Sequence, residues 1–214
     1  GEVNKLADNK LSIRFELTDK THFTSKLTQT IQLPESRLRE AGHLIADKIF
    51  ETITGKRGDF SGKIAYILRS TKNNKPFYQL QIADTDGAQP QVIFTSSEPL
   101  MSPTWSPDGK TIAYVSFETG QATIFIQNIF TAERVQVTNF KGFSSAPAFS
   151  PDGNALLFTS SMNGNADIYQ ITLKNNTLKS IISHTAIDTE ASYTPDGQSI
   201  IFTSDRGGTP QIYQ

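Results

Sequence analysis

The chain has 214 residues, of which 36% are hydrophobic, no cysteine, and a formal net charge of −1 at pH 7. This composition excludes a disordered chain, disulfides and cysteine-ligated zinc, and the scattered lysines and arginines offer no basic stripe to a nucleic acid. No window approaches the ~20 consecutive apolar residues of a membrane-spanning helix, and the first residues lack the layout of a secretory signal, so we expect a soluble chain that is mature or truncated.

Residues 1–58 have the pattern of two strands followed by a helix. Apolar residues alternate with polar ones from Leu11 to Leu17 and from Leu27 to Leu33, which is the period of half-buried strands. From Leu38 to Ile53 they recur every three or four positions, as on one face of a helix, and Gly55 is suited to a left-handed cap. Because a hairpin and one helix form a thin layer, we predict the C-terminal part of an α/β domain with further elements upstream.

An aromatic residue, a hydroxyl residue and Pro-Asp-Gly recur three times in the second part of the chain, at an interval of 44 residues. The copies are Trp105–Gly109, Phe149–Gly153 and Tyr193–Gly197, and a fainter repeat begins at Ile64. A period of this length with short strands is typical of propeller blades. We predict that residues 59–214 form a β-propeller sector of about three and a half four-stranded blades, the first without its inner strand and the last ending near its third. Since a closed ring needs at least four blades, this propeller is expected to be truncated.

The repeated signature is explained by turn chemistry. Proline fixes φ at the first turn position, aspartate accepts a hydrogen bond from the backbone just ahead, and glycine adopts the positive φ that reverses the chain. The aromatic residue is predicted to wedge between neighbouring blades. We interpret the triplets as hairpin turns that carry no chemistry.

Signals for catalysis are weak. The three histidines, His22, His43 and His184, lie in different segments and suggest no serine-histidine-acid set. The segment from Gly142 to Ala146 is one residue short of a nucleophile elbow around Ser144, and no helix is predicted after it. We expect no enzymatic activity and no cofactor.

Two patterns are compatible with a metal but incomplete. Asp84–Gly87 begins like a calcium loop, yet its twelfth position is Thr95, where a bidentate glutamate is required. His43 and Asp47 are one helical turn apart, but the sequence offers them no third ligand. We predict a turn between outer strands for the first, a polar contact at an interdomain surface for the second, and no metal site.

Both parts of the chain resemble one family, the TolB proteins of Gram-negative bacteria. The domain junction carries Leu38–His43, Thr54-Gly55 and Ile64–Tyr66, and the repeats carry Ser102–Gly109 and Ala146–Gly153. The resemblance covers nearly the whole chain, and the junction is its more specific part. It implies a mainly β fold, a partial, truncated six-bladed β-propeller preceded by part of a small α/β domain.

The resemblance also implies a role. Members of the family are periplasmic, non-enzymatic components of the Tol-Pal system that bind the peptidoglycan-associated lipoprotein Pal and contribute to outer-membrane integrity, cell division and protein transport. The family contacts TolA through its extreme N-terminus, and colicins use the Pal-binding surface of some members. We expect this chain to lack the TolA-contacting segment and about two and a half blades.

Loops that enter the inner strands surround one mouth of a propeller, and loops on a rigid scaffold are where binding residues collect. The family's Pal-contacting positions match Phe143, Ala146, Thr189 and Glu190, and Phe143 stands where a histidine is common in the family. Of these, Thr189 and Glu190 are the strongest candidates because they are polar and have no predicted core role. The full predicted partner-binding set is Met101, Phe143, Ser144, Ala146, Asp188, Thr189 and Glu190.

Two other functions are compatible with a propeller. The substrate-gating propeller of a prolyl-oligopeptidase-like serine peptidase would require a hydrolase domain beyond Gln214. A lyase that acts within the channel would require histidines or carboxylates clustered near the axis, and the visible repeats do not supply them.

Overall fold

The computed structural model describes residues 1–214. They form two compact units: residues 1–64 with 83–89, and residues 65–82 with 90–214. The short connection 83–89 thus clusters with the first unit, although it joins two strands of the first propeller sheet.

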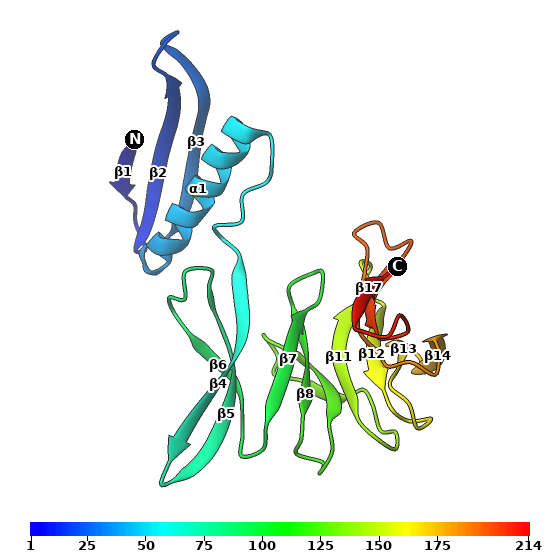
Figure 1. The fold of residues 1–214 in the computed structure, drawn as a ribbon. Helices are drawn as coiled ribbons and strands as arrows, with labels where there is room; N and C mark the ends of the chain where they lie inside the picture. The colour runs from blue at the N-terminus through cyan, green and yellow to red at the C-terminus, as the bar shows by residue number, and fades with distance from the viewer. The chain divides into compact units, whose positions relative to one another are not determined.

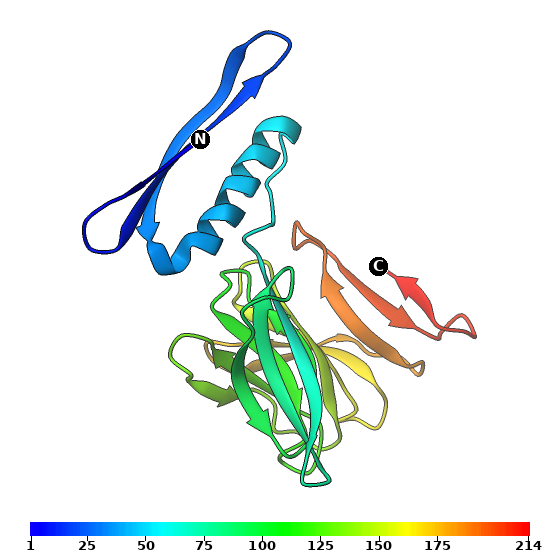
Figure 2. The same cartoon turned by 90° about the vertical axis from the view of Figure 1, so that its left-hand side faces the viewer.

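The first unit is an antiparallel three-stranded sheet with one helix on one face (Figure 1). Its strands lie in the order β1 (Glu2–Lys5), β2 (Lys10–Asp19) and β3 (Thr24–Pro34), and the helix α1 (Leu38–Thr54) follows a short 3-10 turn, Glu35–Arg37. The two alternating segments of the sequence are β2 and β3, whose long hairpin is seen clearly in Figure 2. Strand β1 was not expected: its four residues are all exposed and only one of them is apolar, so they carry no period.

Helix α1 ends where the sequence predicts. Gly55 follows it with φ 69°, and its N–H donates to the carbonyl of Glu51. Only the middle of the apolar stripe is covered, because Ala41 and Ile45 pack on Leu11 and Ile13, whereas Ile53 is 67% exposed. No helix of this structure has the length and apolar character needed to cross a lipid bilayer.

The second unit consists of successive antiparallel sheets that repeat one blade pattern (Figure 1). The first blade is β4 (Lys63–Lys72), β5 (Lys75–Asp84) and β6 (Gln91–Ser96). The second is β7 (Leu100–Trp105), β8 (Thr111–Ser116), β9 (Thr123–Asn128) and β10 (Arg134–Gln136). The third is β11 (Ser144–Phe149), β12 (Ala155–Ser160), β13 (Asp167–Thr172) and β14 (Thr177–Ile182), and the fourth is β15 (Asp188–Tyr193), β16 (Ile200–Ser204) and β17 (Gln211–Tyr213).

The blades follow one another in chain order, and the inner strand β11 contacts both β7 and β15. Each of the three apolar clusters of this unit joins two neighbouring blades; one contains Ala113 and Ile124 of the second blade with Leu156 and Phe158 of the third. The aromatic residues of the signature, Trp105, Phe149 and Tyr193, each pack on one of these clusters, as predicted. The sequence-based fold, an open sector of a β-propeller, is confirmed.

The Pro-Asp-Gly turns have the expected geometry, and the hydroxyl residue before them has a role as well. In the second copy, Gly153 has φ 73°, and Asp152 Oδ1 accepts a hydrogen bond from Asn154 N at 3.0 Å. The Ser150 hydroxyl donates to Asp152 at 2.5 Å and accepts from Ala155 N at 3.0 Å, so it joins the turn to the next strand. These contacts recur with Ser106 and Thr194.

Stacked aromatic pairs join the second and third strands of three blades. Their centroids are 5.9 to 6.3 Å apart, and the pairs are Tyr114–Phe125, Phe158–Tyr169 and Phe202–Tyr213. A planar group covers each pair: the Arg134 guanidinium, the Phe140 ring and the Arg206 guanidinium, in that order. The repeat thus extends into the core, with a different cover in each blade.

Candidate functional site

The predicted partner-binding residues lie at the beginnings of three adjacent inner strands. Met101 is in β7, Ser144 and Ala146 are in β11, and Thr189 and Glu190 are in β15. The list is completed by Phe143, directly before β11, and Asp188, which begins β15. Since the blades are copies and β11 contacts both neighbours, these residues share one end of the blade array.

Each inner strand has an irregularity at the same place. Ser102, Ala146 and Glu190, spaced by 44 residues, have φ of 50°, 48° and 55°, in the left-handed region that few residues other than glycine adopt. The strand register shifts at each of these positions, as in a β-bulge. The chain is therefore redirected at the same point in three blades, which takes these residues out of the regular ladder.

The seven residues differ in their access to solvent. Met101 is 52% exposed and Phe143 39%, Glu190 is exposed, and Ala146 and Thr189 are half-buried. Ser144 and Asp188, by contrast, are 2% and 0% exposed. In this structure the side chains of Ser144 and Asp188 are therefore part of the protein interior and are not open to a partner.

Asp188 is held by a complete set of partners. Its carboxylate accepts two hydrogen bonds from Arg206 Nη2, at 2.9 and 3.1 Å, and Arg206 also stacks on Phe202 and Tyr213. Because a buried carboxylate without a partner is costly, Arg206 fixes the start of β15. The residues at the equivalent positions of the third blade are Ser144 and Met162, which are both uncharged.

Phe143 is anchored through its backbone. Its N–H donates to Ser161 Oγ at 3.1 Å, and its carbonyl accepts from Ser161 N and from Ser160 Oγ. In the fourth blade, the N–H of Ile187 donates to Asp205 Oδ1 at 2.8 Å and its carbonyl accepts from Asp205 N. Phe143 and Ile187 are thus held in the same way, 44 residues apart.

Ile187 was missed by the sequence analysis. It is 53% exposed, and an apolar residue with that exposure directly before an inner strand is a partner-contact candidate. Its distance of one repeat from Phe143 was the signal that could have found it. We call the exposed and half-exposed set the rim: Met101, Phe143, Ala146, Ile187, Thr189 and Glu190.

The first unit contains a separate polar cluster. Its centre is the buried Asp84, which accepts hydrogen bonds from Arg39 at 2.9 Å and from Lys63. The hydrogen bond from the Lys63 ammonium lowers the pKa of Asp84, and Arg39 lowers it further. Burial acts in the opposite direction, but the pKa stays below its ordinary value. His43 Nε2 lies 3.8 Å from Asp84 and, with Asp86, completes three groups that could reach one ion. Two cations already neutralise the carboxylates, so the cluster needs no metal to balance its charge.

Asp47 does not pair with His43. It accepts hydrogen bonds from Phe60 N at 2.6 Å and from Ser61 N at 3.1 Å, and thereby holds the segment after the helix. Burial alone would raise the pKa of Asp47, but these hydrogen bonds outweigh it and the pKa lies below its ordinary value. The predicted pairing of a histidine with an aspartate four residues later is therefore wrong, because Asp84, distant in sequence, takes that place.

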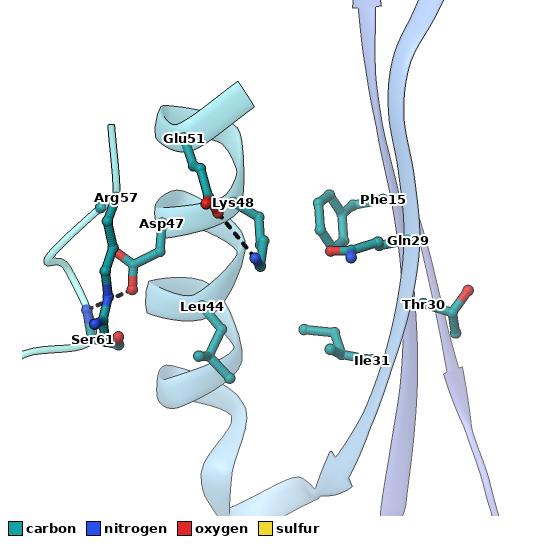
Figure 3. A pocket seen from close by; sticks show the side chains of 11 residues that line it. Phe15, Gln29, Thr30, Ile31, Leu44, Asp47, Lys48, Glu51, Arg57 and Ser61 are labelled. Atoms are coloured by element: carbon teal, nitrogen blue, oxygen red, sulfur yellow. Dashed lines mark hydrogen bonds and ion pairs between the residues drawn. The ribbon is translucent and has the colours of Figure 1, made fainter. Parts of the chain in front are cut away.

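A cavity of about 440 Å³ opens between α1 and the sheet (Figure 3). Phe15 and Ile31 project from the sheet toward Leu44 of the helix, and the Lys48–Glu51 ion pair lies at its edge. The lining mixes an apolar floor with the paired Lys48 and Glu51 and with Asp47, whose carboxylate accepts backbone hydrogen bonds.

Ser144 lies in a strand and not at a strand-to-helix turn. Its N–H donates to the carbonyl of Ala122, in the preceding blade, at 2.9 Å. A nucleophile elbow requires a serine exposed at a sharp turn before a helix, which this site does not have.

The chain was compared with known proteins. The family model "TolB beta propeller domain" matches residues 50–214. The Tol-Pal system protein TolB of Acinetobacter baylyi is 49% identical over 146 residues, which are 68% of this chain and 34% of that protein. The homologue of Bordetella avium is 44% identical, over 68% of this chain and 32% of its own length. The matched part of this chain therefore spans about a third of the length of these curated relatives.

The fold of this chain is also similar to that of solved structures. The crystal structure of TolB from Acinetobacter baumannii superimposes with a TM-score of 0.91 at 48% identity, over 99% of this chain and 53% of that one. The tricorn protease, with a TM-score of 0.51 and 12% identity, shares the fold alone. The blade signature, the family model and the superposition agree, and this chain belongs to the TolB family of the Tol-Pal system.

Proposed function

We propose that this chain is a periplasmic protein-binding scaffold that docks the lipoprotein Pal at the rim. The observation that supports this most is the exposure of Met101, Phe143 and Ile187, which lie in or directly before successive inner strands that pack on the central strand β11. Exposed apolar side chains on a rigid support are typical of protein interfaces. Membership of the TolB family makes Pal the partner of choice.

The proposed activity is binding without a chemical step. A partner segment at the rim would contact three blades at once, so that many small contacts are made without folding or closing any element. The peptidase alternative has no observation in its favour beyond the shared fold. Through Pal the chain would contribute to outer-membrane integrity and to cell division, whereas contacts with TolA and colicins stay predictions with no residue assigned in this chain.

Calorimetric titration of this chain with purified Pal tests the proposal. We expect saturable binding of wild type and at least a tenfold weaker affinity, ~1.4 kcal/mol or more, for the Thr189→Ala/Glu190→Ala double variant. Both side chains are outside the packed clusters, so the thermal midpoint should stay near that of wild type. Glu133→Ala, on an exposed turn between outer strands of the second blade, is the control. Equal affinities of wild type and the double variant contradict the site.

A further inference from the structure

Two exposed apolar residues of the rim, Phe143 and Ile187, lie in adjacent blades. We call this pair the apolar step. Phe143 and Ile187 occupy the same repeat position, directly before β11 and β15, and equivalent backbone hydrogen bonds hold both. Because β11 and β15 are neighbours, these two exposed apolar residues stand at the same point of adjacent blades. Met101 extends the apolar surface toward the second blade.

The charged residues near the apolar step differ in whether they already have a partner of opposite charge. The arginines of the second and fourth blades are already paired: Arg134 with Glu118 at 2.6 Å, and Arg206 with the buried Asp188. The Arg134 guanidinium also holds the pKa of Glu118 below its ordinary value. This carboxylate is therefore ionised, and the charge of Arg134 balances it. Glu190 and Glu98 are exposed and belong to no ion pair, and the exposed Lys141 stands two residues before Phe143.

The backbone of Glu190 is held in position by contacts with two blades. Its backbone is in the left-handed region, and its N–H donates to Thr159 Oγ1 of the third blade at 3.2 Å. The carboxylate therefore projects from a backbone fixed by two blades, which lowers the ordering cost when a cation binds it. It stands three residues after Ile187, at the same end of β15.

We infer that the segment docked at the rim presents an apolar side chain to Phe143 and Ile187 and a lysine or arginine to Glu190. This inference rests on the proposed function and names the chemistry of the Pal segment. An apolar residue would bury the step, and the neighbouring cation would meet the unpaired carboxylate, which favours association at low salt. Ile187 is the contact residue that this adds to the site.

The apolar contact is tested by Ile187→Ser, with Val135→Ser as the matched control. Val135 is 48% exposed on the outer strand β10, so both variants remove a similarly exposed branched side chain. We expect Ile187→Ser to weaken Pal binding at least tenfold in calorimetry and Val135→Ser to leave it within twofold. Circular dichroism melts of both should match wild type. Equal effects of the two variants would overturn the contact.

The ionic contact is tested by Glu190→Gln against Glu133→Gln. We expect the first to weaken binding about fivefold at 50 mM NaCl and to flatten its salt dependence, and the second to change neither. Glu190→Lys should abolish binding, and one lysine-to-glutamate or arginine-to-glutamate variant of Pal should restore it. Binding that is independent of the charge at residue 190 would overturn this part.

The outcomes also separate the inference from the proposed function. If wild type does not bind Pal, both are overturned. If the Thr189→Ala/Glu190→Ala double variant loses binding while Ile187→Ser and Glu190→Gln retain it, the proposed function stands and the assigned chemistry is wrong.

Discussion

The backbone N–H of Glu190 donates a hydrogen bond to the hydroxyl of Thr159, a residue of the preceding blade, at 3.2 Å. The equivalent of Thr159 in the second blade is Val115, which cannot accept a hydrogen bond. Thr159→Val therefore gives the third blade the side chain of the second. Since Thr159 is buried, we expect the free energy of unfolding to fall by about 1 kcal/mol in urea denaturation. Thr203→Val, at the same repeat position in the fourth blade, is the control, and an equal loss there would contradict a specific role.

A second prediction concerns the left-handed backbone of Ala146, whose φ is 48°. Glycine adopts this conformation without the cost that a Cβ imposes, so Ala146→Gly should raise the free energy of unfolding by about 0.5 kcal/mol. Ala148→Gly, two residues later in the same strand, should lower it by about 1 kcal/mol. Urea denaturation of both variants measures the difference. If both substitutions destabilise equally, the left-handed position is not a source of strain.

A third prediction concerns the buried pair of Asp188 and Arg206. Arg206→Met removes the only cation paired with a fully buried carboxylate, and we expect roughly 3 kcal/mol of destabilisation. The Asp188→Ser/Arg206→Met double variant reproduces the Ser144 and Met162 pair of the third blade and should recover at least half of that loss. Thermal unfolding gives the comparison. A double variant less stable than the single one would show that the charges themselves stabilise the blade.

The turn aspartates lead to a prediction on pH. The Ser150 hydroxyl, with hydrogen bonds from Asn154, lowers the pKa of Asp152 to about 2. Because the folded-state pKa is depressed, its contribution to stability is present above about pH 4 and is lost as the pH falls toward 2. Ser150→Ala should move the pKa of Asp152 toward about 4, as measured by carbon-detected NMR titration of its carboxyl. Asp108 and Asp196 keep their hydroxyl partners and should titrate as in wild type, so a shift common to all three would rule out a local cause.

Much of the propeller was predictable from the sequence because its signals are local and repeated. The signature from Phe149 to Gly153 carries its own turn, and the interval of 44 residues sets the neighbouring blades in register. The position of Gly55 likewise marks the end of α1. Strand β1 was not predictable, since its pairing with β2 comes from the backbone and its side chains have no pattern.

The candidate site was less predictable, for two physical reasons. Ser102, Ala146 and Glu190 share a left-handed backbone, yet they have no chemical feature in common and none is glycine or asparagine. The conformation is imposed by the packing of the strand, which no local pattern records. His43 illustrates the second reason: its acidic neighbour, Asp84, is 41 positions away in the sequence, and only the folded chain brings them together.

The displacement of residues 102, 146 and 190 from the strand ladders has a consequence for how such a protein can change. A serine, an alanine and a glutamate occupy one geometric position in three copies, and the blades around them remain alike. Selection for a new ligand can therefore act on these positions with little penalty to folding, and the recognition surface can diversify while the architecture beneath it is conserved.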